Sequence, residues 1–172
     1  MNKILDGNKP SLSFIVAAYN VSNSIERCLK SIQSQSFDNF EVIVINDKST
    51  DNTLEISQSF AEKDTLGRIK VISHLCNKGL AAVRNTGLLS ASGTYIWHID
   101  GDDYLGNINA AEYVIDVFNQ NKTPIVKIGV YKEINKNDFI KNCPPFESKI
   151  DFENELSTPF AQVKKGGLGG VF

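Results

Sequence analysis

The sequence predicts an α/β fold in which helices cover both faces of a mostly parallel sheet. Short apolar runs alternate with stretches of helical periodicity through roughly the first 130 of the 172 residues. A chain of this length can bury one sizeable core but not two. Hydrophobic residues make up 41% and charged residues 22%, as in ordinary globular proteins. The net charge of −2 argues against a nucleic-acid partner bound through a broad cationic face.

Five apolar runs are predicted to form strands. Each is rich in β-branched or aromatic residues and is bounded by polar residues or turn formers. Because helical segments separate the first four runs, right-handed crossovers would make the strands parallel. The predicted strands span residues 12–18, 40–45, 70–75, 94–99 and 124–130.

Four helices are predicted between and after these strands. The first carries its apolar residues at i, i+4 and i+7 from Ile25, which gives one apolar stripe. The third spans residues 80–91 and contains Gly87, which we expect to allow close packing against the sheet. The predicted caps of the other helices are Asn23 with Glu26, Ser49 or Asp51, and Asn109 with Glu112.

Cysteine usage and the N-terminus indicate a cytoplasmic protein. Cys28, Cys76 and Cys143 are far apart, and no CxxC pair or Cys/His cluster predicts a structural zinc site. Residues 1–9 lack the apolar run of a signal peptide. No stretch approaches the roughly 20 apolar residues of a transmembrane helix. The sequence is also compatible with peripheral association at the inner face of the membrane and with a homo-oligomer.

Polar residues follow three of the predicted strands. Tyr19 follows the first, Asp47 the second, and the segment Asp100–Asp103 the fourth. In an open parallel sheet, ligands bind beyond the carboxyl ends of the strands, where the strand order reverses. We therefore expect an aromatic ring and several carboxylates to converge on one crevice.

The segment Asp100–Asp103 favours a divalent cation site. Its three carboxylates would repel one another in a tight turn, and a bound cation removes that cost. Oxygen ligands favour Mg²⁺ or Mn²⁺, and Mg²⁺ usually binds one or two carboxylates together with substrate phosphates. A solvated acidic turn is the alternative for an isolated motif of this kind. The position after a strand, with Asp47 expected nearby, favours the metal site and a diphosphate ligand.

Other polar residues each have a functional and a structural interpretation. A carboxylate at Asp47 could accept a hydrogen bond from a base or ribose. Tyr19 could stack on a nucleobase or cover the edge of the sheet. Lys78 and Arg84 are candidates to meet phosphate charge, or are solvated cations.

The histidines are interpreted as structural. His74 and His98 are taken as strand residues without partners, and Trp97 as a core residue. No cysteine is assigned as a nucleophile, because none has an activating neighbour in the sequence.

Five segments resemble successive signatures of glycosyltransferase family 2. Each is weak alone, but five in this order and spacing are specific, and together they cover roughly residues 11–105. They are SFIVAAYN at 13–20, CLKSIQSQ at 28–35, EVIVINDKSTD at 41–51, NKG at 77–79 with Arg84 and Asn85, and GTYIWHIDGDD at 93–103.

The resemblance implies a Rossmann-like GT-A fold and inverting transfer of a sugar from a nucleotide diphosphate, with a UDP-sugar as the expected donor. The implied acceptor is a hydroxyl of a saccharide or lipid-linked saccharide in cell-surface polysaccharide synthesis. By position, Tyr19 would line the base pocket and Asp47 would bind the base. Asp100 would approach the ribose or sugar, and Asp102 would ligate Mn²⁺ or Mg²⁺ with Asp100 as second candidate. The remaining donor-site candidates are Lys78, Arg84 and Asn85.

Two departures from the family pattern affect this interpretation. Family members often have Asp-Asp-Gly-Ser where this chain has Asn46, Asp47, Lys48 and Ser49. The family also has a second acidic motif that supplies the general base, and nothing after residue 105 matches it. We therefore expect a truncated chain that binds donor without efficient transfer. The expected divisions are an N-terminal tail at 1–10, the nucleotide-sugar domain at 11–135, and a partial acceptor-side region or loop at 136–172.

Two alternatives stay open at the level of sequence. The first is a nucleotide-binding protein that does not turn over, or whose site a partner completes. The second is a haloacid-dehalogenase-like phosphatase, in which Asp100 would be the nucleophile of a strand-borne DxD motif. That motif usually lies early in its domain and continues with Gly-Thr, whereas this one follows about four strands and continues with Asp103 and Tyr104.

Overall fold

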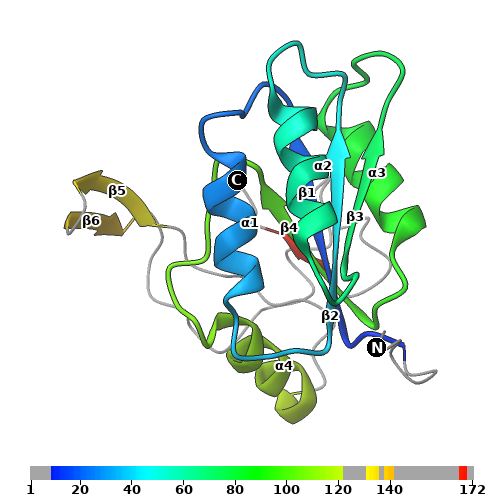
Figure 1. The fold of residues 1–172 in the computed structure, drawn as a ribbon. Coiled ribbons are helices and arrows are strands. Elements are labelled where there is room, and N and C mark those ends of the chain that lie inside the picture. Colours follow the sequence, from blue (N-terminus) through cyan, green and yellow to red (C-terminus); the bar gives the residue numbers. More distant parts are fainter. Residues whose placement is uncertain (1–8, 122–130, 136–137, 142–166, 170–172) are drawn as a thin grey trace, which may run out of the picture.

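The computed structural model describes residues 9–121, 131–135, 138–141 and 167–169. A five-stranded sheet of order β3-β2-β1-β4-β7 forms the centre of the molecule, and all its pairings are parallel (Figure 1). A separate antiparallel pair joins β5 and β6. The strands are β1 (Leu12–Ala18), β2 (Phe40–Asn46), β3 (Ile69–Ser73), β4 (Tyr95–Asp100), β5 (Tyr131–Asn135), β6 (Asp138–Lys141) and β7 (Gly167–Gly169).

The strand order reverses at β1. From β1 the chain adds β2 and then β3 on one side, and it returns to place β4 on the other side of β1. Ala18 pairs with Asn46 of β2, and Ala17 pairs with Asp100 of β4. The carboxyl ends of β2 and β4 therefore flank the end of β1, which is the position where open α/β sheets bind ligands.

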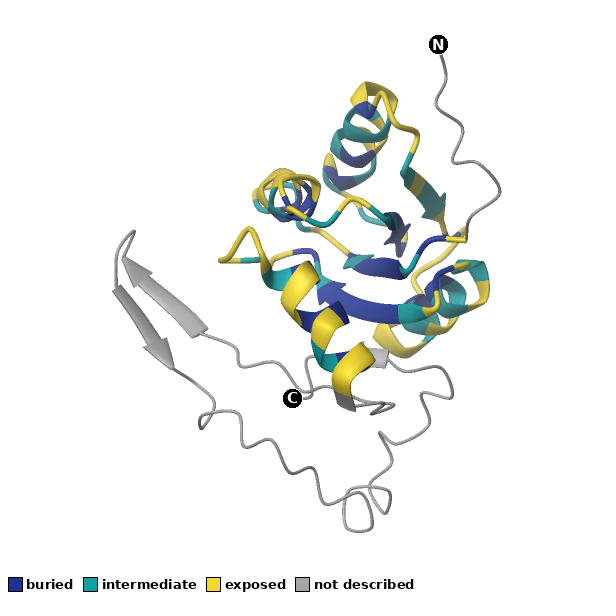
Figure 2. Ribbon diagram, turned by 90° about the horizontal axis from the view of Figure 1, so that it is seen from below, coloured by how far each residue is buried: buried dark blue, intermediate teal, exposed yellow. Residues whose placement is uncertain are grey.

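Helices cover both faces of the sheet, as predicted. Side chains of α1, α2 and α4 join one core cluster with β1, β2 and β4, whereas Val83 and Leu88 of α3 pack with Ile15, Ile43 and Ile96 on the opposite face. Buried residues line the sheet and the inner sides of the helices (Figure 2). The helices are α1 (Ile25–Gln33), α2 (Thr53–Lys63), α3 (Leu80–Ser90) and α4 (Ala110–Asn121).

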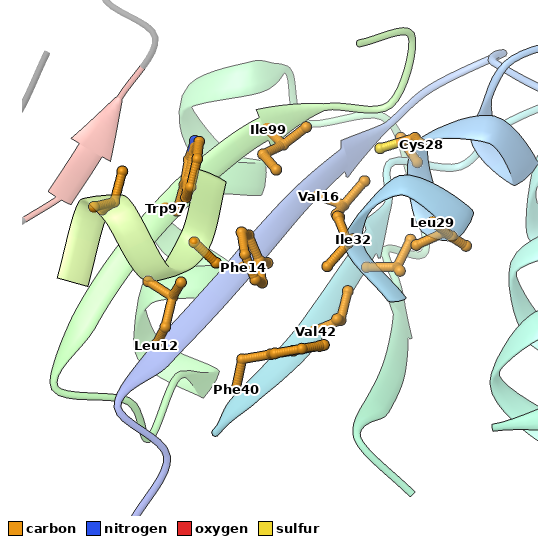
Figure 3. Close-up of a cluster of buried hydrophobic side chains, with 14 of the residues drawn as sticks. Leu12, Phe14, Val16, Cys28, Leu29, Ile32, Phe40, Val42, Trp97 and Ile99 are labelled. Atoms are coloured by element: carbon orange, nitrogen blue, oxygen red, sulfur yellow. The ribbon is translucent and has the colours of Figure 1, made fainter. Parts of the chain in front are cut away.

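The larger core is built around aromatic residues. Phe14 of β1 packs edge-on against Phe40 of β2, with ring centroids 5.4 Å apart, and lies at the same distance from Trp97 of β4 (Figure 3). Trp97 is 5% exposed, which confirms its assignment to the core. Burial of these rings removes a large apolar area from water and fixes the positions of the three central strands.

Gly87 allows α3 to approach the sheet closely, as predicted. A Cβ atom at this position would lie 2.2 Å from Cγ2 of Ile15, a distance that no side chain can tolerate. This close approach brings α3 against β1 and β2.

Two predictions about the ends of elements are wrong. The expected capping box of Asn23 and Glu26 does not start α1, because Ser24 is the N-cap residue and makes no side-chain cap hydrogen bond. Glu26 pairs instead with Lys30 at 2.7 Å. The third strand ends at Ser73 rather than at residue 75, so His74 lies beyond the strand.

The predicted cap of α2 at Ser49 or Asp51 is also wrong. Asn52 is the N-cap residue and makes no side-chain cap hydrogen bond, although Asp51 accepts the backbone N–H of Thr53 at 3.0 Å. The predicted strand at 124–130 lies outside the described residues. The domain boundaries at residues 10 and 135 remain predictions. No helix in the described part of the chain is long and apolar enough to span a bilayer.

Candidate functional site

The polar residues expected at the strand ends do lie at one edge of the sheet. The backbone N–H of Asp47 donates to the carbonyl of Ala18 at 2.9 Å, and that of Gly101 donates to the carbonyl of Ala17 at 2.8 Å. The chains at Asp47 and Gly101 therefore flank β1, separated by two strand spacings of about 5 Å each. This edge of the sheet is the candidate site.

Two loops at this edge are linked to each other. Asn20, which follows β1, accepts a hydrogen bond from the backbone N–H of Thr50 at 2.8 Å, and its own N–H donates to Ser49 Oγ at 3.0 Å. Asp51 accepts the N–H of Ser22 at 3.0 Å. Tyr19 lies at the start of these linked loops, and its 49% exposure leaves the ring accessible to a ligand.

Hydrogen bonds hold Asp51 in its ionised form. Burial alone would raise its pKa, but donation from Thr53 and Ser22 outweighs burial and lowers the pKa to about 2. The loops after β1 and β2 thus form one ordered unit beside Tyr19.

Asp47 is buried, with 3% of its surface exposed. Its carboxylate accepts hydrogen bonds from the backbone N–H groups of Lys78 at 2.9 Å and Gly79 at 2.8 Å, and it lies 2.6 Å from Nδ1 of His74. Burial would raise the pKa of Asp47, but the hydrogen bonds from His74, Lys78 and Gly79 outweigh it and lower the pKa. Asp47 is therefore a carboxylate enclosed by donors of the chain itself.

The acidic turn after β4 is different. Asp102 and Asp103 are both exposed. Although Asp103 is exposed, partial desolvation by the surrounding chain, together with the neighbouring carboxylates of Asp102 and Asp100, raises its pKa above the ordinary value. The side chain of Asp100 lies 3.3 Å from Nη2 of Arg84 on α3. Repulsion among these carboxylates favours binding of a positive charge.

Arg27 of α1 also contacts the acidic turn. Its guanidinium lies 4.3 Å from the centroid of the Tyr104 ring, and Nη2 lies 3.5 Å from the carbonyl oxygen of Asp102. A planar cation stacked on an aromatic ring is a favourable arrangement. Arg27 thus supports the turn from the side of α1.

The residues of the turn fit a divalent cation that is shared with a ligand. Within the described ranges, no three His, Cys, Asp or Glu side chains form a group that could hold a metal ion unaided. Asp100 and Asp102 offer two carboxylates. Mg²⁺ commonly binds through one or two carboxylates and completes its shell with water and substrate phosphates.

Sequence reasoning missed the role of His74. Its ring contacts Asp47 and Thr86, so the interpretation of His74 as a strand histidine without partners is wrong. His98 is buried. Its burial, and to a smaller extent the positive charge of Arg84, lowers its pKa to about 4. No pattern in the sequence near His74 indicates these contacts, because Asp47 and Thr86 meet His74 only through the packing of β2, β3 and α3.

The other candidates lie around α3 and α1. The side chains of Lys78 and Asn85 are exposed, and Arg84 is the residue of this group that contacts an acidic side chain of the site.

Cys28 is buried and burial raises its pKa to about 12, while Cys76 is an exposed free thiol. A thiol with such a pKa is not a nucleophile, as predicted for Cys28.

The comparison with protein families decides the class of this protein. The model of "Glycosyl transferase family 2" matches residues 13–167, which include both the sheet and the acidic turn. The chain belongs to glycosyl transferase family 2. This assignment favours the glycosyltransferase hypothesis over the phosphatase alternative and agrees with the predicted GT-A fold.

Relatives and solved structures agree with the family. EpsJ of Bacillus subtilis (strain 168), described as an uncharacterized glycosyltransferase, is 40% identical over 124 residues, which are 72% of this chain and 35% of EpsJ. The chondroitin synthase of Pasteurella multocida (strain Pm70) is 37% identical over 114 residues, 66% of this chain and 11% of that protein. Residues 1–349 of S. aureus TarS in complex with UDP-GlcNAc superpose with a TM-score of 0.62 at 30% identity, covering 68% of this chain and 34% of that TarS fragment.

The matched region is part of a longer protein in each of these cases. The chain spans about a third of the length of EpsJ and of the TarS fragment.

Proposed function

We propose that this chain binds the nucleotide-sugar donor of an inverting glycosyltransferase, with a UDP-sugar as donor and a hydroxyl group as acceptor. The observation that carries the proposal is the convergence of Tyr19, Asp47, Arg84 and the Asp100–Asp103 turn at the carboxyl edge of the sheet in a member of this family. The edge lies where the strand order reverses, which is where α/β sheets bind nucleotides.

The base and ribose would bind beside the end of β1. Tyr19 exposes about half of its surface there, so its ring is available to stack on a base. Asp47 is proposed to orient the base side of the pocket, together with the linked loops that follow β1 and β2. The similarity to TarS, whose structure contains UDP-GlcNAc, favours uracil as the base.

The diphosphate would bind at the acidic turn. Asp102, with Asp100 beside it, would hold Mn²⁺ or Mg²⁺, which as a Lewis acid stabilises the negative charge of the diphosphate. Arg84 pairs with Asp100, so its guanidinium is close to the place where phosphate charge is expected. Lys78 and Asn85 complete the proposed donor site from the start of α3 and from its surface.

The proposed reaction is direct displacement at the anomeric carbon. The acceptor oxygen forms the new bond and gives its proton to a carboxylate base, which the described residues do not identify, while the nucleoside diphosphate leaves with the electron pair of the broken bond. The similarity to a chondroitin synthase favours a saccharide acceptor and a polysaccharide product. A lipid-linked acceptor would place the reaction at the inner face of the membrane.

Calorimetric titration tests donor binding. UDP, GDP, CDP and ADP are each titrated into the protein with Mn²⁺ and with EDTA. The proposal expects binding of UDP in the micromolar range that weakens at least about tenfold without metal. Asp102→Asn should abolish the metal dependence, whereas Asp116→Asn, which removes an exposed carboxylate from α4, should leave it intact. Equal affinity with and without metal, or absence of binding by all four nucleotides, contradicts the proposal.

A further inference from the structure

A buried hydrogen-bond network joins the ends of β2 and β3 to α3. The side chains of His74 and Asp47 are 5% and 4% exposed. His74 Nδ1 lies 2.6 Å from Asp47 Oδ1, and Nε2 lies 2.9 Å from Oγ1 of Thr86 on α3. An ionised carboxylate only accepts hydrogen bonds, so Nδ1 of His74 carries the proton. His74 therefore bridges Asp47 to the body of α3.

The same carboxylate holds the turn that begins α3. Asp47 Oδ2 accepts the N–H of Gly79 at 2.8 Å, and both carboxylate oxygens lie within 3.1 Å of the N–H of Lys78. Gly79 is the N-cap residue of α3 and has a φ of 81°. Because a helix start without a side-chain cap needs an acceptor from elsewhere, Asp47 fixes where α3 begins.

The position of α3 matters for the acidic turn. Arg84 extends from α3 to Asp100, with 3.3 Å between Nη2 and Oδ1. A displacement of the start of α3 would therefore alter the pairing of Asp100 and the place of Arg84 beside it. The two strand ends that flank β1 are thus connected through α3.

We propose that His74 is a positioning residue of the donor site: through Asp47 and Thr86 it holds the 77–79 turn and α3 in the arrangement that binds nucleotide. His74 does not contact the donor. It supplies the side-chain donor that fixes the direction of the Asp47 carboxylate, and a buried carboxylate that loses such a donor turns or takes up water. The effect on nucleotide binding rests on the proposed function, whereas the effect on the 77–79 turn does not.

Two substitutions separate the two contacts of the ring. The amide of His74→Asn can reach the position of Nδ1 and keep the hydrogen bond to Asp47, while the longer His74→Gln places its amide near the position of Nε2 and Thr86. Thr86→Val removes the second contact alone. Ser73→Ala is the matched control, because it removes another side-chain hydrogen bond at the same strand ends, the one from Asn46 at 2.8 Å.

Two measurements on each variant test the proposal. Amide hydrogen exchange reports the N–H groups of Lys78 and Gly79, and titration of UDP with Mn²⁺ reports the donor site. We expect His74→Gln to accelerate exchange at both amides and to weaken UDP binding by about tenfold, from the loss of one hydrogen bond to a buried charge. We expect the UDP affinity of His74→Asn to stay within about threefold of that of the unsubstituted protein. Ser73→Ala should match the unsubstituted protein in both amide exchange and UDP affinity.

The outcomes separate this proposal from the donor-binding proposal. If the unsubstituted protein binds no nucleotide, the proposed function fails, and positioning of a donor site by His74 fails with it, although exchange still shows whether His74 holds the turn. If the protein binds UDP and His74→Gln binds it equally well, the role of His74 is overturned and the proposed function stands. Equal losses in His74→Asn and His74→Gln at unchanged exchange also overturn it.

Discussion

Glu41 at the amino end of the sheet and the acidic turn after β4 at its carboxyl end differ in how their carboxylates are satisfied. At the amino end, Glu41 Oε1 accepts hydrogen bonds from Ser13 Oγ at 2.6 Å, from the N–H and Oγ of Ser92, each at 2.7 Å, and from the N–H of Gly93 at 3.1 Å. Burial raises the pKa of Glu41, but these hydrogen bonds outweigh it and hold the pKa below its ordinary value. The chain itself satisfies this carboxylate.

At the carboxyl end, the chain encloses Asp47, but the acidic turn after β4 leaves its carboxylates to the solvent. Asp102 and Asp103 are exposed, yet partial desolvation by the surrounding chain, together with Asp102 and Asp100, raises the pKa of Asp103. The hydrogen bonds of Glu41 stabilise the fold, whereas carboxylates that repel one another at the surface favour a bound positive charge. The comparison therefore separates a carboxylate that stabilises the fold from the turn at which we propose that a cation binds.

Removing the acceptor at the amino end should have the largest effect on stability. Glu41→Ala leaves the donors of Ser13, Ser92 and Gly93 without their shared acceptor, and we expect the free energy of unfolding to fall by about 3 kcal/mol. Urea denaturation measures the change, and Glu55→Ala on the exposed side of α2 is the control. UDP affinity of the folded protein should not change. A loss below about 0.5 kcal/mol would show that this edge is not held by Glu41.

His98 should make stability depend on pH. Its pKa is about 4 in the folded protein and 6.5 in the unfolded chain, so the unfolded state binds more protons between these values. Stability is therefore fully present above pH 6.5 and declines as the pH falls toward 4. We expect a contribution of about 2 kcal/mol between pH 7 and 4.5.

His98→Phe isolates this contribution. Urea denaturation of both proteins at several pH values gives the free energy of unfolding as a function of pH. Because the other titrating groups are common to both proteins, the difference between the two pH profiles is the contribution of His98. Parallel profiles for the variant and the unsubstituted protein would contradict the assignment.

Lys48 should be a site where a substitution stabilises the protein. Its φ of 60° lies in the left-handed region, which costs a residue with a Cβ about 1 kcal/mol. The family often has glycine at this position. Lys48→Gly relieves this backbone cost but makes the unfolded chain more flexible, so the free energy of unfolding should rise by less than about 1 kcal/mol. Thermal unfolding detects this gain. A lower melting temperature would mean that the lysine side chain contributes more than its backbone costs.

Arg27 should have the smallest effect on stability. Replacing it with alanine removes the contact with the Tyr104 ring, worth about 0.5 kcal/mol at an exposed site. Because Arg27 supports the acidic turn, we expect Arg27→Ala to weaken Mn²⁺-dependent UDP binding. Tyr104→Leu, which changes no charge, should weaken UDP binding in the same way. Stronger UDP binding by Arg27→Ala would mean that the charge of Arg27 only repels the metal ion.

The order of strands and helices could be predicted because it depends on local patterns. Apolar runs such as residues 12–18 and 40–45 are long enough to identify strands, and the spacing of Ile25, Leu29 and Ile32 identifies a helix. The carboxyl edge followed from that order, since parallel strands end together. These parts of the structure needed no knowledge of distant contacts.

Contacts between distant residues could not be predicted in this way. His74 and Asp47 are 27 residues apart, and nothing in the sequence around either one shows that they meet. The pairing of Arg84 with Asp100 likewise depends on how α3 packs on the sheet. The start of α1 at Ile25 was misplaced because a capping pattern competes with other ways of satisfying the same N–H groups.

Paramagnetic relaxation by Mn²⁺ tests the central claim most directly. In ¹H–¹⁵N spectra recorded with UDP and substoichiometric Mn²⁺, the account predicts broadening of the amide signals of Gly101, Asp102 and Asp103, with those of Glu41 and Gly93 unaffected. Broadening centred on Glu41 and Gly93, or equal broadening at both ends of the sheet, would contradict it.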